Sequence, residues 1–457
     1  MTTAMTTETI FALSSAPGKA GVAVVRVSGP KAHESFKAVA RRDDILPRKA
    51  VFTPLYDAEG AVIDEALVLA FQGPHSFTGE DVIEYQIHGS PAVLDALFAR
   101  LGSCGGHRMA EPGEFTRRAF ENGKLDLTEA EAVADLINAQ TQMQRLQALG
   151  QMGGALSKLY EDWRTRLIKS MAYIEAVIDF PDEDIPDSEV MTVLPALQAL
   201  TQEIESHLND GHRGERLRDG IRIAILGAPN AGKSSLLNAL ARRDAAIVSP
   251  MAGTTRDVIE VHLDLGGYPV ILADTAGLRP EELSEAGGHD SVEAEGIKRA
   301  LARAREADIK LVVFDGMEPA PNPHSLSLLD EKAIAIFTKQ DAPGNVIPAL
   351  RSAITHADCA ALSSQNGAGM DSLLALLTRR IAGSFAAKGD APSLTRARHR
   401  AALEECLERL RAAITALRPE LMAEDIRMAA RALGRITGRI DVEDLLDVIF
   451  RDFCIGK

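Results

Sequence analysis

The sequence is poor in aromatic and cysteine residues and contains no long apolar run. Aromatic residues make up 4% of the 457 positions, so we expect cores of Leu, Ile, Val and Ala that are often helical. The four cysteines form no CxxC pair, which disfavours a disulfide framework or zinc site and fits a reducing compartment. No apolar run approaches the roughly 18 residues of a membrane span. Since no basic segment followed by an apolar stretch opens the chain, we expect no signal peptide and a cytoplasmic location.

The sequence also lacks an excess of positive charge. Its net charge is −15, from 50 Lys and Arg against 65 Asp and Glu. This balance argues against a protein whose whole surface attracts nucleic acid, but it does not exclude a local basic face. The length of 457 residues suggests about three domains.

The residue pattern that predicts secondary structure changes three times along the chain. An N-terminal α+β domain is predicted from strand-like runs bounded by turn residues, at 22–27, 66–71 and 81–88. Helical spacing begins near Leu127, where Thr128 and Glu131 form a capping-box pattern, and continues with a helix over 188–208. Apolar strands then alternate with helical segments, as in a mostly parallel α/β sheet; these strands are 221–226, 270–273, 310–314 and 333–337.

Helical spacing returns after the α/β region. One apolar face runs from Leu403 to Leu417, and a second runs from Leu445 to Phe453. Helices on both sides indicate one discontinuous all-α domain that carries an inserted α/β P-loop GTPase domain of the Ras-like type, since domain insertion occurs where termini lie close together. The predicted boundaries are 1–122, 123–215, 216–382 and 383–457.

A phosphate-binding loop is the strongest motif. Gly227-Ala-Pro-Asn-Ala-Gly-Lys-Ser234 follows a predicted strand and opens a predicted helix, so backbone N–H groups and the helix N-terminus face the phosphates. We predict that Lys233 reaches the β and γ phosphates and that Ser234 binds Mg²⁺. The alternative, a chance glycine-rich turn, does not explain this context. The other nucleotide contacts predicted in this loop are Asn230, Ala231, Gly232 and Ser235.

Two further segments match the switches of a guanine-nucleotide hydrolase. Asp274, Thr275, Ala276 and Gly277 follow a predicted strand, where the Asp reaches Mg²⁺ through water and the glycine N–H senses the γ-phosphate. The second segment is Gly253-Thr-Thr-Arg-Asp257, upstream of the first, and its Thr255 is a predicted Mg²⁺ ligand. Leu278 occupies the place where Ras-like proteins have a water-orienting Gln, so either hydrolysis is slow or another residue orients the water.

The base is read by Thr338-Lys339-Gln340-Asp341. The carboxylate of Asp341 accepts hydrogen bonds from guanine N1–H and N2–H₂, a pattern that adenine lacks. Thr338 replaces the usual loop-bracing Asn. Ser363 and Ser364, in a Ser-Ser-Gln variant of the common Ser-Ala-Lys, are predicted to lie beside the base. Together these motifs predict an enzyme that hydrolyses GTP.

These motifs and the chain ends resemble the MnmE (TrmE) family of bacterial tRNA-modification GTPases. The most specific matches lie outside the α/β region and are Ser76-Phe-Thr-Gly-Glu-Asp81, His88-Gly89, Pro112-Gly-Glu-Phe-Thr-Arg117, Asn122-Gly-Lys-Leu-Asp126 and Phe453-Cys-Ile-Gly-Lys457. The resemblance implies a homodimer formed through the N-terminal domain and an FAD-dependent MnmG (GidA) partner in a heterotetramer. It implies that the pair modify carbon 5 of the wobble uridine of certain tRNAs, adding glycine or ammonium.

The resemblance also implies a one-carbon donor, 5-formyl-tetrahydrofolate or a related reduced folate. Family contacts to it map onto Arg26, Glu84, Lys124 and Lys457, which are otherwise ordinary charged residues. A carboxylate suits the N–H groups of a pterin, and Arg or Lys suits its glutamate tail. The family places Cys454 near this site, where a reaction role is considered; the alternative is a buried structural cysteine.

For hydrolysis, the resemblance implies K⁺ in place of an arginine finger. The ion is held by Asn230 with Thr254 and the backbone carbonyls of Ser249 and Met251; Ser249 and Thr254 also belong to the nucleotide site. The alternative is that Asn230 only braces the loop. Glu293 is expected to position the attacking water, with Glu295 as runner-up.

One basic pattern and one rival function remain. Arg427, Arg431, Arg435 and Arg439 recur every four residues, which predicts a stripe that either contacts tRNA phosphate or the partner, or forms local ion pairs on a solvated face. The rival function is a GTP-dependent binding switch, such as a ribosome-assembly GTPase. Binding of a reduced folate would separate the two.

Overall fold

A computed structural model describes residues 8–179, 187–243, 246–247, 260–274, 306–354, 358–385, 392–440, 443–451 and 453–456. The chain forms two compact units that are both discontinuous in sequence. The first comprises 1–134, 151–202 and 402–457, and the second comprises 135–150 and 203–401. No helix among the described residues is long and apolar enough to cross a membrane.

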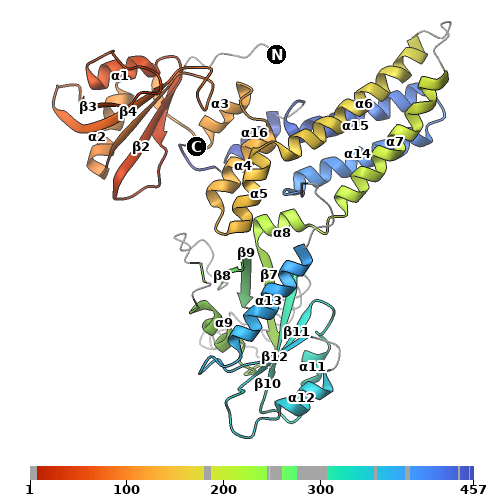
Figure 1. Cartoon of the computed structure of the whole chain (residues 1–457). Coiled ribbons are helices and arrows are strands. Elements are labelled where there is room, and N and C mark those ends of the chain that lie inside the picture. Colours follow the sequence, from red (N-terminus) through yellow and green to blue (C-terminus); the bar gives the residue numbers. More distant parts are fainter. Residues whose placement is uncertain are drawn as a thin grey trace, which may run out of the picture. The chain divides into compact units, whose positions relative to one another are not determined.

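The first unit contains a six-stranded sheet in the order β3-β4-β5-β2-β1-β6. Strands β2, β3 and β4 of this sheet are labelled in Figure 1. Neighbouring strands in this sheet are antiparallel, except that β1 and β6 are parallel to each other. The strands are β1 Thr9–Leu13, β2 Ala20–Ser28, β3 Val51–Tyr56, β4 Val62–Phe71, β5 Val82–Gly89 and β6 His107–Met109. Helices α1 (Ala32–Ala40) and α2 (Pro91–Gly102) bury one face of this sheet, with Phe36 and Leu97 in the core. The α+β prediction for the N-terminal region is confirmed.

Helices from both ends of the chain make up the rest of this unit. They are α3 Glu114–Glu121, α4 Leu127–Asn138, α6 Ala155–Asp179, α7 Asp187–Leu208, α14 Ala397–Thr415, α15 Pro419–Thr437 and α16 Glu443–Arg451, with the start of α14 and the ends of α4 and α7 assigned to the second unit. Helices α6 and α15 lie side by side although more than 200 residues separate them (Figure 1). The predicted discontinuous helical domain is therefore confirmed.

Two details of the helix predictions are wrong. The capping box of α4 is formed by Asp126 and Glu129, two residues before the predicted pair: the Glu129 N–H donates to Asp126 Oδ1 (2.9 Å), and the Asp126 N–H donates to Glu129 Oε2 (2.9 Å). Because Asp caps a helix as well as Thr does, the pairs Asp126–Glu129 and Thr128–Glu131 both match the capping-box pattern. Leu417 is not on an apolar face, because α14 ends at Thr415 and Leu417 is 97% exposed.

The second unit contains the predicted α/β sheet, with order β12-β11-β10-β7-β9-β8. All neighbours are parallel except β8 and β9, which form a hairpin. Its elements are α5 Gln142–Met152, α8 Arg213–Asp219, β7 Ile221–Gly227, α9 Lys233–Ala241, β8 Glu260–Leu265, β9 Tyr268–Asp274, β10 Ile309–Asp315, α11 Pro323–Leu326, β11 Ala333–Thr338, α12 Ile347–Ala353, β12 Asp358–Ala361 and α13 Met370–Phe385, with the last two residues of α5 assigned to the first unit.

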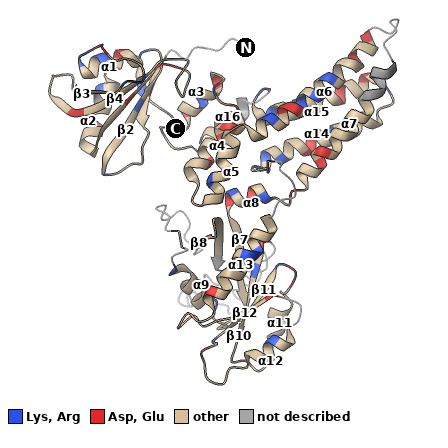
Figure 2. Cartoon of the chain, viewed as in Figure 1, with Lys and Arg blue, Asp and Glu red and all other residues tan. Residues whose placement is uncertain are grey.

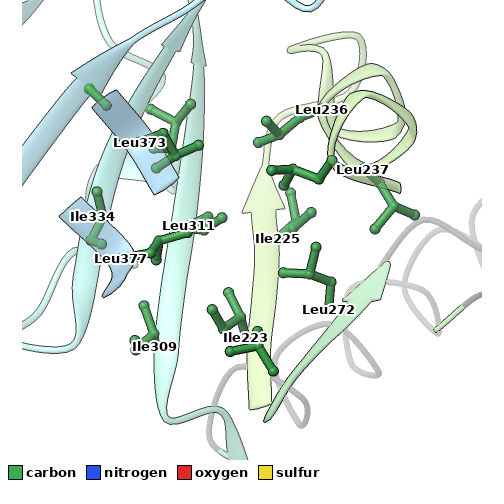
Figure 3. Packing of buried hydrophobic residues seen from close by; sticks show 14 of the residues in the cluster. Ile223, Ile225, Leu236, Leu237, Leu272, Ile309, Leu311, Ile334, Leu373 and Leu377 are labelled. Atoms are coloured by element: carbon green, nitrogen blue, oxygen red, sulfur yellow. The ribbon is translucent and has the colours of Figure 1, made fainter. Parts of the chain in front are cut away.

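The apolar strands of this sheet are buried on both faces. Ile223, Leu311 and Ile334 pack with α9 and α13 in one cluster (Figure 3). The neighbouring residues Val312 and Ala335 point to the other face and pack with α12. Burial on both faces explains why these strands appear as continuous apolar runs. It also leaves only the loops at the strand ends available for chemistry.

Candidate functional site

The phosphate-binding loop directly follows the central strand β7. Gly227 has φ of +146°, and a Cβ there would lie 2.4 Å from the Val313 carbonyl oxygen, so only glycine fits. Gly232 is the left-handed N-cap of α9, and Asn230 is also left-handed, with φ of +62°. Asn tolerates this conformation better than most residues. The sequence thus determines the path of the loop locally.

The groups of this loop suit an anionic ligand. Lys233 Nζ lies over the loop and donates to the carbonyl oxygens of Gly227 (3.0 Å) and Ala228 (2.8 Å). Ser234 and Ser235, in the first turn of α9, are exposed. The N-terminus of α9 adds N–H groups and positive potential, which favour a phosphate. Asn230 is exposed and Ala231 is buried.

Asp274 is the last residue of β9 and pairs with Ile225 of β7. Its backbone therefore lies beside the strand that leads into the phosphate loop. The other predicted switch and cation residues lie outside the described residues: Ser249, Met251, Thr254, Thr255, Thr275, Ala276, Gly277, Glu293 and Glu295.

Thr338 takes part in bracing the phosphate loop, a contact that the sequence reasoning missed. Its side chain is buried, and its hydroxyl lies 2.8 Å from the Ala231 carbonyl oxygen and 3.2 Å from that of Phe314. Because a hydroxyl has one proton, it can donate fully to only one of them. The hydroxyl thus links the predicted base-reading loop to the phosphate loop without the usual amide.

The other residues that the sequence predicts to read the base lie at the same edge of the sheet, after β11 and β12. Lys339 is left-handed and forms an ion pair with Asp315, the last residue of β10. Asp341 is exposed. Ser363 is buried, and its hydroxyl accepts from the Gln365 N–H (3.2 Å) while it organises the loop that contains Ser364. Asp315 was also missed, although a carboxylate that ends a buried strand could have signalled it.

The N-terminal domain holds two of the predicted folate residues as a pair. Arg26 of β2 and Glu84 of β5 are cross-strand neighbours, and Arg26 Nε donates to Glu84 Oε1 at 2.9 Å. Their side chains are 17% and 18% exposed. The guanidinium also lies over the rings of Phe77 (5.3 Å) and Phe115 (5.6 Å). They are therefore more than isolated surface charges.

Lys124 and the C-terminal tail approach the same domain. Lys124 Nζ donates to the Pro74 carbonyl oxygen (2.9 Å), in the loop that also contains Phe77. In the tail, the Cys454 carbonyl accepts from the Gly113 N–H (3.4 Å), and the Gly456 carbonyl accepts from Ser14 Oγ (3.0 Å). Cys454 is exposed, so the alternative of a buried structural cysteine is wrong. Lys457 lies outside the described residues.

Three of the four periodic arginines form ion pairs. Arg427 pairs with Glu175 and Glu424, Arg435 with Glu405, and Arg439 with Glu161. Arg431 is exposed. Figure 2 shows residues of both charge signs on α6, α14 and α15. The interpretation of a face that makes local ion pairs therefore fits better than a free basic stripe.

Known proteins match this chain along nearly all its length. A family model described as the MnmE helical domain matches residues 127–454, and one described as the GTP-binding protein TrmE N-terminus matches residues 9–124. The tRNA modification GTPase MnmE of Parvibaculum lavamentivorans is 53% identical over 460 residues, which cover 98% of this chain and 100% of that protein. The protein of the same name from Paramagnetospirillum magneticum is 53% identical over 451 residues, with the same coverage of both chains. The chain is therefore a member of the MnmE family of tRNA modification GTPases.

Proposed function

We propose that this protein hydrolyses GTP to drive modification of carbon 5 of the wobble uridine in certain tRNAs. The observation that carries the proposal is the convergence of the phosphate loop, Asp274 and the base-reading loops at one edge of a parallel sheet, in a chain that matches the family throughout. A tRNA substrate would place the protein in the cytoplasm. The proposed domain boundaries remain 1–122, 123–215, 216–382 and 383–457.

In the nucleotide site, Lys233 would neutralise the β and γ phosphates, while Ser234 and Thr255 would hold Mg²⁺. Asp274 would contact that ion through water, and Asp341 would select guanine. Mg²⁺ and K⁺, when bound, supply positive charge where negative charge develops on the phosphates. The further contacts of the proposed nucleotide site are Asn230, Ala231, Gly232, Ser235, Ser249, Thr254, Thr275, Ala276, Gly277, Thr338, Lys339, Ser363 and Ser364.

The proposed K⁺ site consists of Asn230, Ser249, Met251 and Thr254. GTP turnover should be faster in K⁺ than in matched Na⁺ buffer. The difference should grow with protein concentration if the GTPase domains of two chains pair and thereby order the site. Asn230→Ala should remove the difference. Equal rates in both salts would show that another group supplies the charge.

Glu293 is proposed to orient the attacking water. Because such a contact acts mainly in the transition state, Glu293→Ala should leave GTP affinity nearly intact and reduce turnover severely. Glu295→Ala is the matched control. If Glu295→Ala has this effect instead, the assignment moves by two residues.

The N-terminal domain is proposed to bind 5-formyl-tetrahydrofolate or a related reduced folate through Arg26, Glu84, Lys124 and Lys457. The paired, half-buried Arg26 and Glu84 support this role, because they present both signs of charge at one place. A pterin N–H group can donate to Glu84, and the glutamate tail can pair with a cation. Cys454 is retained as a candidate catalytic group, since it is exposed in a tail that contacts this domain.

The homodimer is proposed to form on the sheet face opposite α1 and α2. On that face Phe52 and Leu67 are cross-strand neighbours, and they are 65% and 36% exposed. Leu69 follows on the same face and pairs with Glu84, so the apolar surface continues to the proposed folate site. Exposed apolar patches of this kind mark interaction sites. An FAD-dependent MnmG (GidA) partner would complete a heterotetramer.

The test is reconstitution with the purified chain, the flavoprotein partner, unmodified tRNA, GTP, a reduced folate and glycine. Mass analysis of the tRNA nucleosides should show a modified wobble uridine, and Lys233→Ala should abolish it. Hydrolysis of GTP without modification under these conditions, together with no folate binding, would favour a GTP-dependent binding switch.

A further inference from the structure

The loop 73–81 contacts two of the proposed folate residues, Arg26 and Lys124. Phe77 lies under the Arg26 guanidinium, and Lys124 Nζ donates to the Pro74 carbonyl. Asn122 Nδ2 donates to the Thr78 carbonyl (2.7 Å). Strand β2 and the segment 122–124 thus both contact this loop. The position of the loop therefore affects how Arg26 and Lys124 are arranged in the proposed folate site.

Glu80 anchors the loop on a buried network. Arg118, which is 2% exposed, donates from Nη1 to both carboxylate oxygens of Glu80, at 3.2 and 3.1 Å. Ser28 Oγ donates to Glu80 Oε2 (2.7 Å) and lies 2.7 Å from Thr78 Oγ1. Three segments distant in sequence therefore meet at one carboxylate: β2, the loop and α3.

The second carboxylate that Arg118 contacts belongs to Glu114, and other residues hold it in place. Glu114 Oε1 accepts from Arg118 Nη2 (2.9 Å), and Arg108 donates to both Glu114 oxygens. Burial acts to raise the pKa of Glu114, but hydrogen bonds from Arg108 and the Glu111 N–H, with the charge of Arg118, lower it overall. A guanidinium held between two carboxylates has little freedom, so the network is rigid.

Phe77 is the exposed aromatic residue of this anchored loop. It is 37% exposed, whereas Phe115, the other ring near Arg26, is fully buried. An exposed aromatic ring beside a half-buried guanidinium offers a flat surface and a charge to a conjugated, anionic ligand. The hydrogen bonds of Glu80 and Arg118 do not require an exposed ring at Phe77, and neither does the hydrophobic core.

We propose that Phe77 is a ring-stacking contact of the ligand site around Arg26, and that Glu80 and Arg118 are positioning residues that hold this ring in place. The ligand class is a conjugated heterocycle that carries carboxylates. The inference rests on the proposed folate site and adds a residue that selects the ring. Phe77 would contact the ligand, while Glu80 and Arg118 would act only through the loop.

The first experiment is calorimetric titration of the full chain with 5-formyl-tetrahydrofolate. Phe77→Ala should raise Kd roughly three- to tenfold, the range expected for loss of one aromatic stacking contact. Phe77→Tyr should restore affinity because it keeps the ring. Leu46→Ala is the matched control, since Leu46 is an exposed apolar residue of the same domain. The Tm of all three variants should stay at the wild-type value.

The second experiment tests the positioning residues. Glu80→Gln removes the charge partner of a buried arginine and can lower Tm, so Ser28→Ala provides the milder change, because it keeps the Arg118–Glu80 ion pair. Both should weaken folate binding, and neither should change GTP turnover. In Phe77→Trp, indole fluorescence should be quenched by folate, and adding Ser28→Ala should reduce that quenching.

The outcomes separate the two levels of the proposal. If the wild type does not bind 5-formyl-tetrahydrofolate, the proposed folate site fails and this inference fails with it. If the wild type binds and Phe77→Ala binds equally well, the inference fails alone. If Phe77→Ala weakens binding and Ser28→Ala and Glu80→Gln do not, the positioning role of the network is overturned.

Discussion

The nucleotide site and the proposed folate site are built in different ways. In the nucleotide site, each loop directly follows one strand of a parallel sheet, and the carboxyl ends of those strands share one edge. The proposed folate site joins two antiparallel strands, the loop 73–81, Lys124 and the C-terminal tail. The first site is therefore assembled from short contiguous motifs, and the second from segments that only the fold brings together.

This difference predicts different responses to substitution. Most groups in the nucleotide site are positioned by their neighbours in sequence, so replacing one of them should change nucleotide binding without displacing another segment. A group in the N-terminal site is positioned by a partner from another segment, so its replacement should also disturb that partner. Four sets of substitutions test this difference.

The largest effect is expected for Asp341→Asn. The amide places a donor where guanine N2–H₂ also donates, so GDP affinity should fall on the order of 100- to 1000-fold, as in other sites that lose a matched polar contact. Binding of a fluorescent GDP analogue would measure this change. Xanthosine diphosphate is the matched control, because its C2 carbonyl accepts from the new amide. Unchanged preference for guanine would exclude Asp341 as the base-reading group.

The next effect is expected for Gly456→Ala, which tests the tail. Gly456 has φ of +95°, and a Cβ there would lie 1.9 Å from the Leu13 carbonyl oxygen. The tail should detach at a cost of about 1–3 kcal/mol, limited by what the tail contributes. Urea unfolding and carboxypeptidase digestion would detect it. Gly383→Ala is the control, since nothing lies within 4 Å of that Cβ. Equal digestion of both variants would contradict the docking of the tail.

A smaller effect is expected for Thr338→Ala. Loss of the hydroxyl leaves the Ala231 carbonyl without its brace, so GDP affinity should fall roughly tenfold, or about 1–2 kcal/mol. Thr338→Ser should retain most of the affinity. Thr415→Ala provides a control at an exposed threonine of α14. If Thr338→Ser were as weak as Thr338→Ala, packing of the methyl group and not the hydroxyl would be responsible.

The smallest effect is expected in a double-mutant cycle of Arg26→Ala and Glu84→Ala. The coupling in unfolding free energy without ligand should be about 0.5–1 kcal/mol, because the pair is only partly shielded from water. Chemical denaturation of the wild type, both single variants and the double variant gives the value. Lys124→Ala combined with Glu84→Ala should be additive. A coupling of zero for Arg26 and Glu84 would remove the contrast between the two sites.

The path of the phosphate loop could be predicted because its conformation depends on local rules. Gly227, Gly232 and Lys233 fall in one continuous segment whose conformation is set by glycine and a helix start. The brace by Thr338 could not be read in the same way, since its acceptor, Ala231, lies 107 residues away. The position of the α4 cap was also missed, because Asp126 and Thr128 both satisfy the capping pattern and only hydrogen bonds distinguish them.

The sequence by itself determined the class of each domain and the path of the phosphate loop, because apolar periodicity and glycine-rich loops act over a few residues. Only the tertiary structure decided that Arg26 faces Glu84, that Arg118 holds Glu80, and that the tail with Cys454 contacts the N-terminal domain. These contacts join residues from 38 to more than 300 positions apart. Their pairing depends on strand register and helix packing, which no short stretch of sequence specifies.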